Sequence, residues 1–117
     1  MNVFYIEKEK FLCLMFELVL KGEKHEVFTT DELDCHYLIK DQNPDLILFS
    51  MDFNEDNLAL LLDEIRTDEQ TMTIPVMAVG FPDQLNVLRE RDKFDDFLEK
   101  PINPMNLEKK LKSYLEK

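Results

Sequence analysis

The hydrophobic and polar positions of the chain fall into two kinds of segment that alternate along its length. Short, almost wholly apolar runs are typical of parallel strands buried on both faces, and they predict strands over residues 2–6, 25–29, 45–50, 74–79 and 94–98. The segments between them carry apolar residues at the spacing of a helix with one buried face. Leu58, Leu61, Leu62 and Ile65 follow this spacing most clearly.

Residues that favour helix ends divide the longer segments. A first helix is predicted over residues 9–21, stopped by Gly22, a second from the cap Thr30 to about residue 41, and a third from Asn54 or Asp56. The last two start at residues 82 and 103–104, each with a proline in its first turn. Five strands alternating with five helices predict an α/β fold, a doubly wound five-stranded parallel sheet in flavodoxin-like order.

Length and composition fit a single domain over residues 1–117. A chain of this length with 44% hydrophobic residues is long enough for one core. The formal net charge of -11 and the absence of a basic run predict no direct nucleic-acid binding. No segment approaches the roughly 20 apolar residues that span a bilayer, and the first residues carry no basic leader region. We therefore expect a soluble, cytoplasmic protein with no membrane contact.

Neither cysteines nor histidines are spaced as metal ligands. Cys13 and Cys35 lie in apolar contexts and do not form a Cys-x-x-Cys pair, which favours core or helix-face thiols over a disulfide or metal site. His25 and His36 have no neighbouring ligands at metal spacing. We therefore expect no metal and no cofactor.

Four segments together resemble a known family, the response-regulator receiver (CheY-like) domains. Residues 44–50, PDLILFS, resemble the third receiver strand, and residues 95–101, DDFLEKP, resemble the receiver ending Asp-Asp-Tyr-Leu-x-Lys-Pro. Residues 3–9 and 74–81 match the first and fourth strands with their following loops. Each motif alone is weak, but four in order at the right spacing are specific, and they cover essentially the whole chain. The resemblance implies bacterial-type two-component signalling.

The same resemblance shows departures in the family's phosphorylation pocket. Ser50 stands where receivers carry the aspartate that accepts the phosphoryl group. Where receivers carry two acids that help to hold magnesium, this chain has Glu7 and Lys8, so one carboxylate of three remains. Gly80 replaces a hydroxyl residue and Phe81 a small one. We expect a degenerate pocket with weak or no magnesium binding and no phosphotransfer.

Simple structural readings exist for the same residues. Glu7 and Lys8 would then form a solvated pair at a strand end, or Lys8 would replace the charge of the metal. Gly80 would permit an unusual backbone turn, and Phe81 would pack outward. These readings stay open at the level of the sequence.

Three further positions complete the degenerate pocket. Lys100 is the residue that contacts phosphoryl oxygens in receivers, and without phosphate we expect a buried salt bridge to Glu7 before Asp52. Asp52 is the only acid just beyond Ser50, but lying two residues further along it is not expected to point at Lys100 as an acceptor would. Phe97 replaces an aromatic switch residue, and its lack of a hydroxyl predicts a permanently inward ring.

These residues predict a non-enzymatic pseudo-receiver that acts as a protein–protein interaction module independently of phosphorylation. One alternative is an atypical receiver phosphorylated on Asp52. A third hypothesis, a small flavin or nucleotide enzyme on the same fold, is disfavoured because Glu7-Lys8-Glu9-Lys10 replaces a loop rich in Ser, Thr and Gly.

The first helix supplies a candidate interface, because Glu17 is the only polar residue between positions 11 and 20. That is more apolar surface than a helix on a sheet needs. The residues assigned to the core are Phe11, Leu14, Met15 and Leu18. The residues predicted to face outward, toward a signalling partner or a second copy of the chain, are Cys13, Phe16 and Leu20. Coverage by neighbouring helices is the alternative.

Overall fold

The computed structural model describes residues 1–22 and 25–115. Its centre is a parallel sheet whose strands lie in the order β2-β1-β3-β4-β5. The strands are β1 (Asn2–Ile6), β2 (Glu26–Thr30), β3 (Leu46–Ser50), β4 (Val76–Gly80) and β5 (Asp96–Glu99). The predicted doubly wound α/β fold of flavodoxin-like topology is confirmed.

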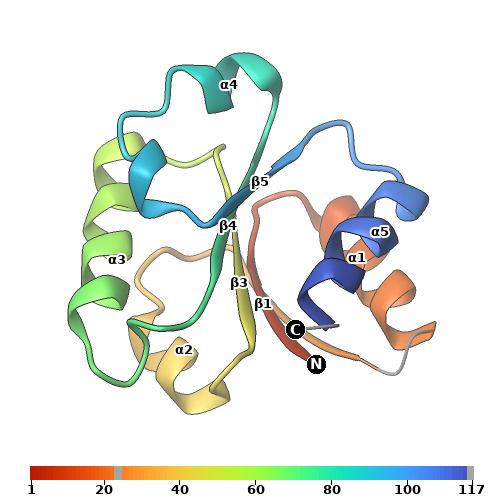
Figure 1. Cartoon of the computed structure of the whole chain (residues 1–117), viewed down its shortest axis with the longest axis horizontal. Coiled ribbons are helices and arrows are strands. Elements are labelled where there is room, and N and C mark those ends of the chain that lie inside the picture. The colour runs from red at the N-terminus through yellow and green to blue at the C-terminus, as the bar shows by residue number, and fades with distance from the viewer. Residues whose placement is uncertain (23–24, 116–117) are drawn as a thin grey trace.

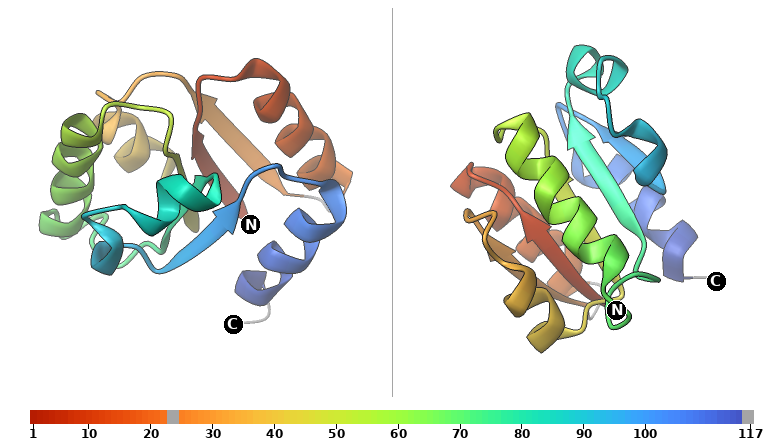
Figure 2. Two further views of the ribbon diagram at one scale, coloured as in Figure 1. Left: turned by 90° about the horizontal axis from the view of Figure 1, so that it is seen from above. Right: turned by 90° about the vertical axis from the view of Figure 1, so that its left-hand side faces the viewer.

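Helices cover both faces of this sheet. They are α1 (Lys10–Gly22), α2 (His36–Gln42), α3 (Glu55–Thr67), α4 (Pro82–Asn86) and α5 (Pro104–Leu115), with a 3₁₀ turn, η1 (Arg91–Lys93), before β5. Figure 1 shows α1 and α5 on one face and α2 and α3 on the other, while α4 lies beyond the carboxyl end of β4. The views in Figure 2 show the same two helical layers.

The sheet is buried on both faces because its central strands carry apolar residues at almost every position. All residues of β3 and β4 are buried. Along β1, Val3 and Tyr5 pack against α1 and α5, while Phe4 and Ile6 pack toward α2 and α3. Full burial of a large apolar side chain contributes about 1.5–3 kcal/mol, so each face of the sheet holds its own core.

The predicted orientation of α1 is wrong. Phe16 and Leu20 are buried, and the ring of Phe16 stacks on Tyr5 with the ring centroids 4.1 Å apart. Cys13 is half-buried. The solvent-facing residues are instead Phe11, Leu14 and Leu18, with exposed fractions of 69%, 57% and 74%. The helix is apolar nearly all round, so periodicity allows several core-facing arcs, and packing against Tyr5 and α5 selects one of them.

Two helix boundaries also differ from the prediction. Thr30 does not cap α2, because it belongs to β2, where its carbonyl accepts from Glu7 N at 2.9 Å. Its hydroxyl accepts from Glu32 N at 3.2 Å in a local turn, and α2 begins only at His36. The predicted cap Asn54 is confirmed, since its side chain accepts hydrogen bonds from the first turn of α3.

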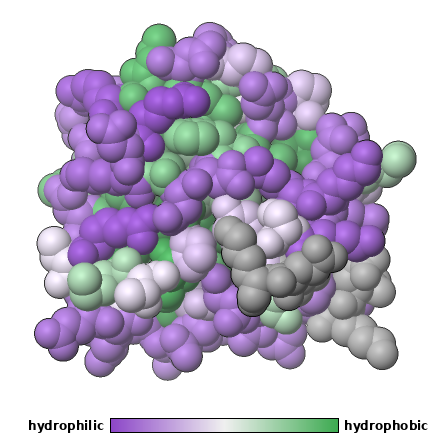
Figure 3. Space-filling view, in the orientation of Figure 1, coloured by the Kyte–Doolittle hydropathy of each residue, from purple (hydrophilic) through white to green (hydrophobic). Residues whose placement is uncertain are grey.

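One face of the molecule is largely polar. Figure 3 shows hydrophilic side chains over most of one molecular face, with hydrophobic atoms gathered mainly in its upper half. Several acids of α3 are held in exposed ion pairs, such as Asp63 with Lys93 at 2.6 Å and Glu55 with Arg89 at 3.1 Å. Within the described ranges, no helix is long and apolar enough to cross a bilayer.

Candidate functional site

The candidate site lies at the carboxyl ends of β1, β3, β4 and β5. Glu7 follows β1, Ser50 ends β3, Gly80 ends β4 and Lys100 follows β5. Parallel strands end at one edge of the sheet, which is where such folds place their chemistry. The backbone N–H of Lys100 donates to the carbonyl of Gly80 at 2.8 Å, which carries the sheet pairing up to the site.

The Lys100 ammonium lies at the centre of this site. Its Nζ lies 3.1 Å from Glu7 Oε1 and 2.8 Å from Asp52 Oδ2, and it donates to Ser50 Oγ at 3.2 Å. The Lys100 side chain is only 4% exposed. An ammonium has three N–H donors, so the three oxygens satisfy it completely. The predicted ion pair with Glu7 is confirmed, but the predicted order of the two partners is wrong, because Asp52 is the nearer acid.

Asp52 points at Lys100 more directly than its place two residues beyond Ser50 led us to expect. Asp52 Oδ2 lies nearer to Lys100 Nζ than Glu7 Oε1 does. The Asp52 side chain keeps 34% of its surface exposed. The chain turns sharply after β3, and the backbone N–H of Asp52 lies 3.4 Å from Ser50 Oγ. This turn folds the Asp52 carboxylate back over the strand end, which strand periodicity does not predict.

Glu7 is a buried carboxylate with a full set of donors. Its Oε1 accepts from the Tyr5 hydroxyl at 2.6 Å as well as from Lys100. Its Oε2 accepts from the backbone N–H groups of Lys8 and Glu9 at 2.9 and 3.3 Å. The backbone donors that precede α1 are therefore taken by a carboxylate of the chain itself. Burial, and then the hydrogen bond to Glu7, raise the pKa of Tyr5, which keeps its hydroxyl a donor.

The side chain of Lys8 takes no part in this cluster. It is exposed, and its ammonium lies over the ring of Phe53, 4.8 Å from the centroid. The reading of Glu7 and Lys8 as one solvated pair is wrong, because Glu7 is buried. The ammonium that lies between the carboxylates of Glu7 and Asp52 is that of Lys100, which follows β5.

Electrostatics keep the central pair charged. Partial burial by itself raises the pKa of Asp52, but hydrogen bonds from Lys100 and Gln84 outweigh it and hold that pKa below its ordinary value. Burial likewise lowers the pKa of Lys100, while hydrogen bonds to Asp52 and Glu7 raise it above its ordinary value. Each charge is thus stabilised by the other.

Sequence reasoning missed one residue of the site, Gln84. Its Nε2 donates to Asp52 Oδ1 at 3.2 Å, and its Oε1 accepts from the backbone N–H of Phe81 at 2.9 Å. Gln84 thereby joins the start of α4 to the Lys100 cluster. The sequence did hold a signal for this contact. Gln84 is the third residue after the cap Phe81, a position from which a glutamine side chain commonly accepts from the backbone N–H of the cap.

Gly80 has a steric role, and the predicted unusual turn is wrong. Gly80 pairs with Glu99 as a regular strand residue, and its φ is not positive. A Cβ on Gly80 would lie 3.0 Å from both Gln84 Oε1 and Met51 Cγ. The missing side chain therefore leaves the room that the Gln84 amide occupies.

The two aromatic candidates lie beside the cluster. Phe81 is exposed, in agreement with outward packing. Phe97 is partly buried against the core on the α3 side, its centroid 6.2 Å from that of Phe94. The Arg91 guanidinium stacks on Phe97 at 4.2 Å. Phe97 thus contacts Phe94 and Arg91, and the groups bonded to Lys100 are those of Glu7, Asp52 and Ser50.

Comparison with known proteins gives structural matches alone. No family model matches the sequence, and no curated protein matches it. A candidate response regulator from Chloroflexus aurantiacus J-10-fl superposes with a TM-score of 0.83 at 20% identity, over 99% of this chain and 98% of that one. A response regulator from Desulfuromonas acetoxidans gives 0.80 at 19% identity, over 98% and 96%.

A third similar structure is the receiver domain of a sensor histidine kinase from Pseudomonas aeruginosa PAO1, with a TM-score of 0.77, 17% identity and coverage of 99% and 98%. That protein holds a magnesium ion in its active-site cleft. At these identities the likeness to the three structures is one of fold. The chain therefore has the fold of the response-regulator receiver domains of two-component signalling.

Proposed function

We propose that the chain is a non-enzymatic pseudo-receiver, a protein–protein interaction module of two-component signalling that acts without being phosphorylated. The observation that supports this most strongly is the place of the Lys100 ammonium, between Glu7 and Asp52 and against Ser50. A cationic side chain lies between the two carboxylates that a metal ion would need, and the end of β3 offers a buried hydroxyl in place of an acceptor carboxylate.

The residues do not fit a magnesium site. Magnesium requires near-octahedral oxygen ligands at about 2.0–2.1 Å. The carboxylates of Glu7 and Asp52 are both bonded to Lys100, which a metal ion would have to displace from a buried position. Over residues 1–22 and 25–115, no group of three or more Asp, Glu, His or Cys side chains is placed to hold a metal ion.

Ser50 is a poor replacement for an acceptor carboxylate. Its side chain is fully buried. Its Oγ accepts hydrogen bonds from Lys100 Nζ at 3.2 Å and from the backbone N–H of Asp52 at 3.4 Å. Its own hydroxyl donates to Asp52 Oδ2 at 3.3 Å. A hydroxyl engaged in this way belongs to the internal network and offers no free lone pair to a phosphodonor.

One observation favours the alternative, phosphorylation on Asp52. This carboxylate is partly exposed, and the adjacent Lys100 would stabilise added negative charge. In that reaction a carboxylate oxygen of Asp52 attacks the phosphorus of a donor such as acetyl phosphate, and acetate leaves. The hydrogen bonds of Asp52 oppose it, because Oδ2 is bonded to Lys100 and Ser50 and Oδ1 accepts from Gln84, so either oxygen must give up a bond before it attacks.

Intact-mass spectrometry tests the proposal. The chain is incubated with acetyl phosphate, with and without magnesium, beside an active receiver domain as positive control. We expect no phosphoryl adduct on this chain. An adduct that disappears in Asp52→Asn establishes the alternative, and an adduct that survives in Asp52→Asn but disappears in Ser50→Ala overturns the account of the pocket.

A further inference from the structure

The solvent side of α1 carries a narrow apolar stripe. Phe11, Leu14 and Leu18 are exposed and stand three and four residues apart, so they lie along one line on the helix. This spacing is that of the seam along which two helices pack side chain between side chains. The opposite side of α1, with Leu12, Phe16 and Leu20, is already buried on the sheet.

We propose that this stripe is a homodimer interface, in which the α1 helices of two copies pack antiparallel about a twofold axis at Leu14. Leu14 then meets the partner's Leu14, and Phe11 meets the partner's Leu18. A second copy of the chain would then be the partner of the interaction module proposed above, so this proposal rests on the proposed function.

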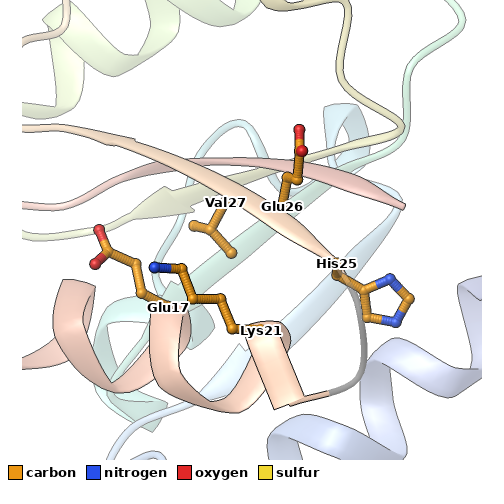
Figure 4. A pocket seen from close by; sticks show the side chains of 5 residues that line it. All are labelled: Glu17, Lys21, His25, Glu26 and Val27. Atoms are coloured by element: carbon orange, nitrogen blue, oxygen red, sulfur yellow. The ribbon is translucent and has the colours of Figure 1, made fainter.

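Charged residues beside the stripe complement one another in this arrangement. Lys10 and Glu17 lie on the side of α1 that faces β2, where each lines a hollow between helix and strand. Figure 4 shows one of them, about 630 Å³ in volume, with Glu17 and Lys21 extending from α1 opposite Val27 of β2. Antiparallel packing centred on Leu14 brings Lys10 of each copy to the partner's Glu17. Parallel packing would instead place Lys10 beside the Lys10 of the other copy, and Glu17 beside its Glu17.

The charge balance of the chain also favours this face. The chain carries -11, so two copies repel each other in general. Helix α1 carries Lys10, Lys21 and Glu17, a balance of +1, whereas four acids and one arginine give α3 a balance of -3. Two copies therefore meet across α1 without the repulsion that α3 would impose.

The size of the stripe sets the expected strength. A stable interface buries about 800 Å² on each partner, and three side chains alone provide less. We expect a reversible dimer with a dissociation constant on the order of 1–100 µM. Sedimentation of the full chain over a range of concentrations should then show the mass rising from the 14.0 kDa monomer toward twice that value.

Two sets of variants identify the surface. Leu14→Glu with Leu18→Glu should remain monomeric at every concentration while keeping the circular dichroism spectrum, because both side chains are exposed. The matched control is Leu60→Glu, a leucine exposed on α3, which should dimerise like the wild type. Lys10→Glu and Glu17→Lys alone should each weaken the dimer on the order of two- to tenfold at low salt, and together they should restore it.

Three outcomes would overturn the inference: a wild type that stays monomeric up to millimolar concentration, a dimer that survives the α1 glutamates, or a charge reversal without recovery. In the first case the stripe serves another protein. These results report the mass of the assembly, whereas the phosphorylation test reports the mass of the chain. A failed dimer and a failed pseudo-receiver are therefore distinguishable.

Discussion

The hydroxyl of Tyr5 donates a 2.6 Å hydrogen bond to Oε1 of Glu7, the same oxygen that lies 3.1 Å from Lys100. The ring of Tyr5 in turn stacks on Phe16 of α1. A single side chain thus joins the core beneath α1 to the charged cluster at the strand ends. The cluster is consequently part of the stabilising core, and substitutions within it should change stability as well as any surface role.

Lys100→Met should destabilise the fold. Loss of one partner of a buried ion pair costs about 3–5 kcal/mol, and the cost here should fall at or somewhat below that range because Glu7 keeps Tyr5 and two backbone donors. Urea unfolding measures it. Lys93→Met removes the exposed ion pairs with Asp63 and Glu90 as the matched control and should lower stability far less. Equal unfolding midpoints for the two variants would show that Lys100 is not held as described.

Phe16→Ala and Phe11→Ala should separate the two sides of α1. Truncating the fully buried Phe16 should cost about 3–5 kcal/mol, whereas Phe11 is exposed and its truncation should stay within about 0.5 kcal/mol. Chemical denaturation of the monomer at low concentration provides both values. Reversed magnitudes would mean that the helix is rotated relative to this structure.

Gly80→Ala should disturb the start of α4. The added methyl would lie 3.0 Å from Gln84 Oε1 and Met51 Cγ, and such overpacking costs about 1–3 kcal/mol. Amide hydrogen exchange in α4 should rise as Gln84 is displaced from Asp52. Gln84→Ala removes one of the two crowded contacts, so the double variant should lose less stability than the sum of the singles. Strict additivity would contradict the steric role of Gly80.

The contribution of Asp52 should depend on pH in one direction. Because its pKa is lower in the folded chain than when unfolded, the carboxylate stabilises the fold above the unfolded pKa of about 4, and this stabilisation is lost as the pH falls through the folded pKa. The difference in unfolding free energy between the wild type and Asp52→Asn should be present at pH 7 and shrink below about pH 4. A difference that grew on acidification would refute the ion pair.

Ser50→Asp alone should not create a magnesium site. The new carboxylate would stand beside Lys100, which already occupies the space between Glu7 and Asp52. Isothermal titration calorimetry with magnesium should therefore show no tight binding. Ser50→Asp combined with Lys8→Asp supplies more acids and should bind measurably more tightly. Tight binding by Ser50→Asp alone would show that Lys100 yields to the metal.

The strands follow from local pattern, and their order in the sheet follows from the general rules for alternating strands and helices. Runs such as residues 46–50 and 76–80 are apolar at nearly every position, and that is compatible only with burial on both faces. The sequence also predicts the edge of the sheet at which the site lies, because the carboxyl ends of parallel strands all lie at one edge. Glu7, Ser50 and Lys100 could therefore be placed together from the sequence, and their association is confirmed.

The tertiary structure alone decided which side of α1 is buried, where Asp52 points and what Gln84 does. A helix that is apolar all round has no unique periodicity, so packing of Phe16 on Tyr5 selects its orientation. The direction of Asp52 depends on a turn, and the contact of Gln84 depends on the space that Gly80 leaves at another strand end. Local sequence specifies the identity of such side chains, but their partners come from segments about thirty to fifty residues away, and only the folded chain brings them within hydrogen-bonding distance.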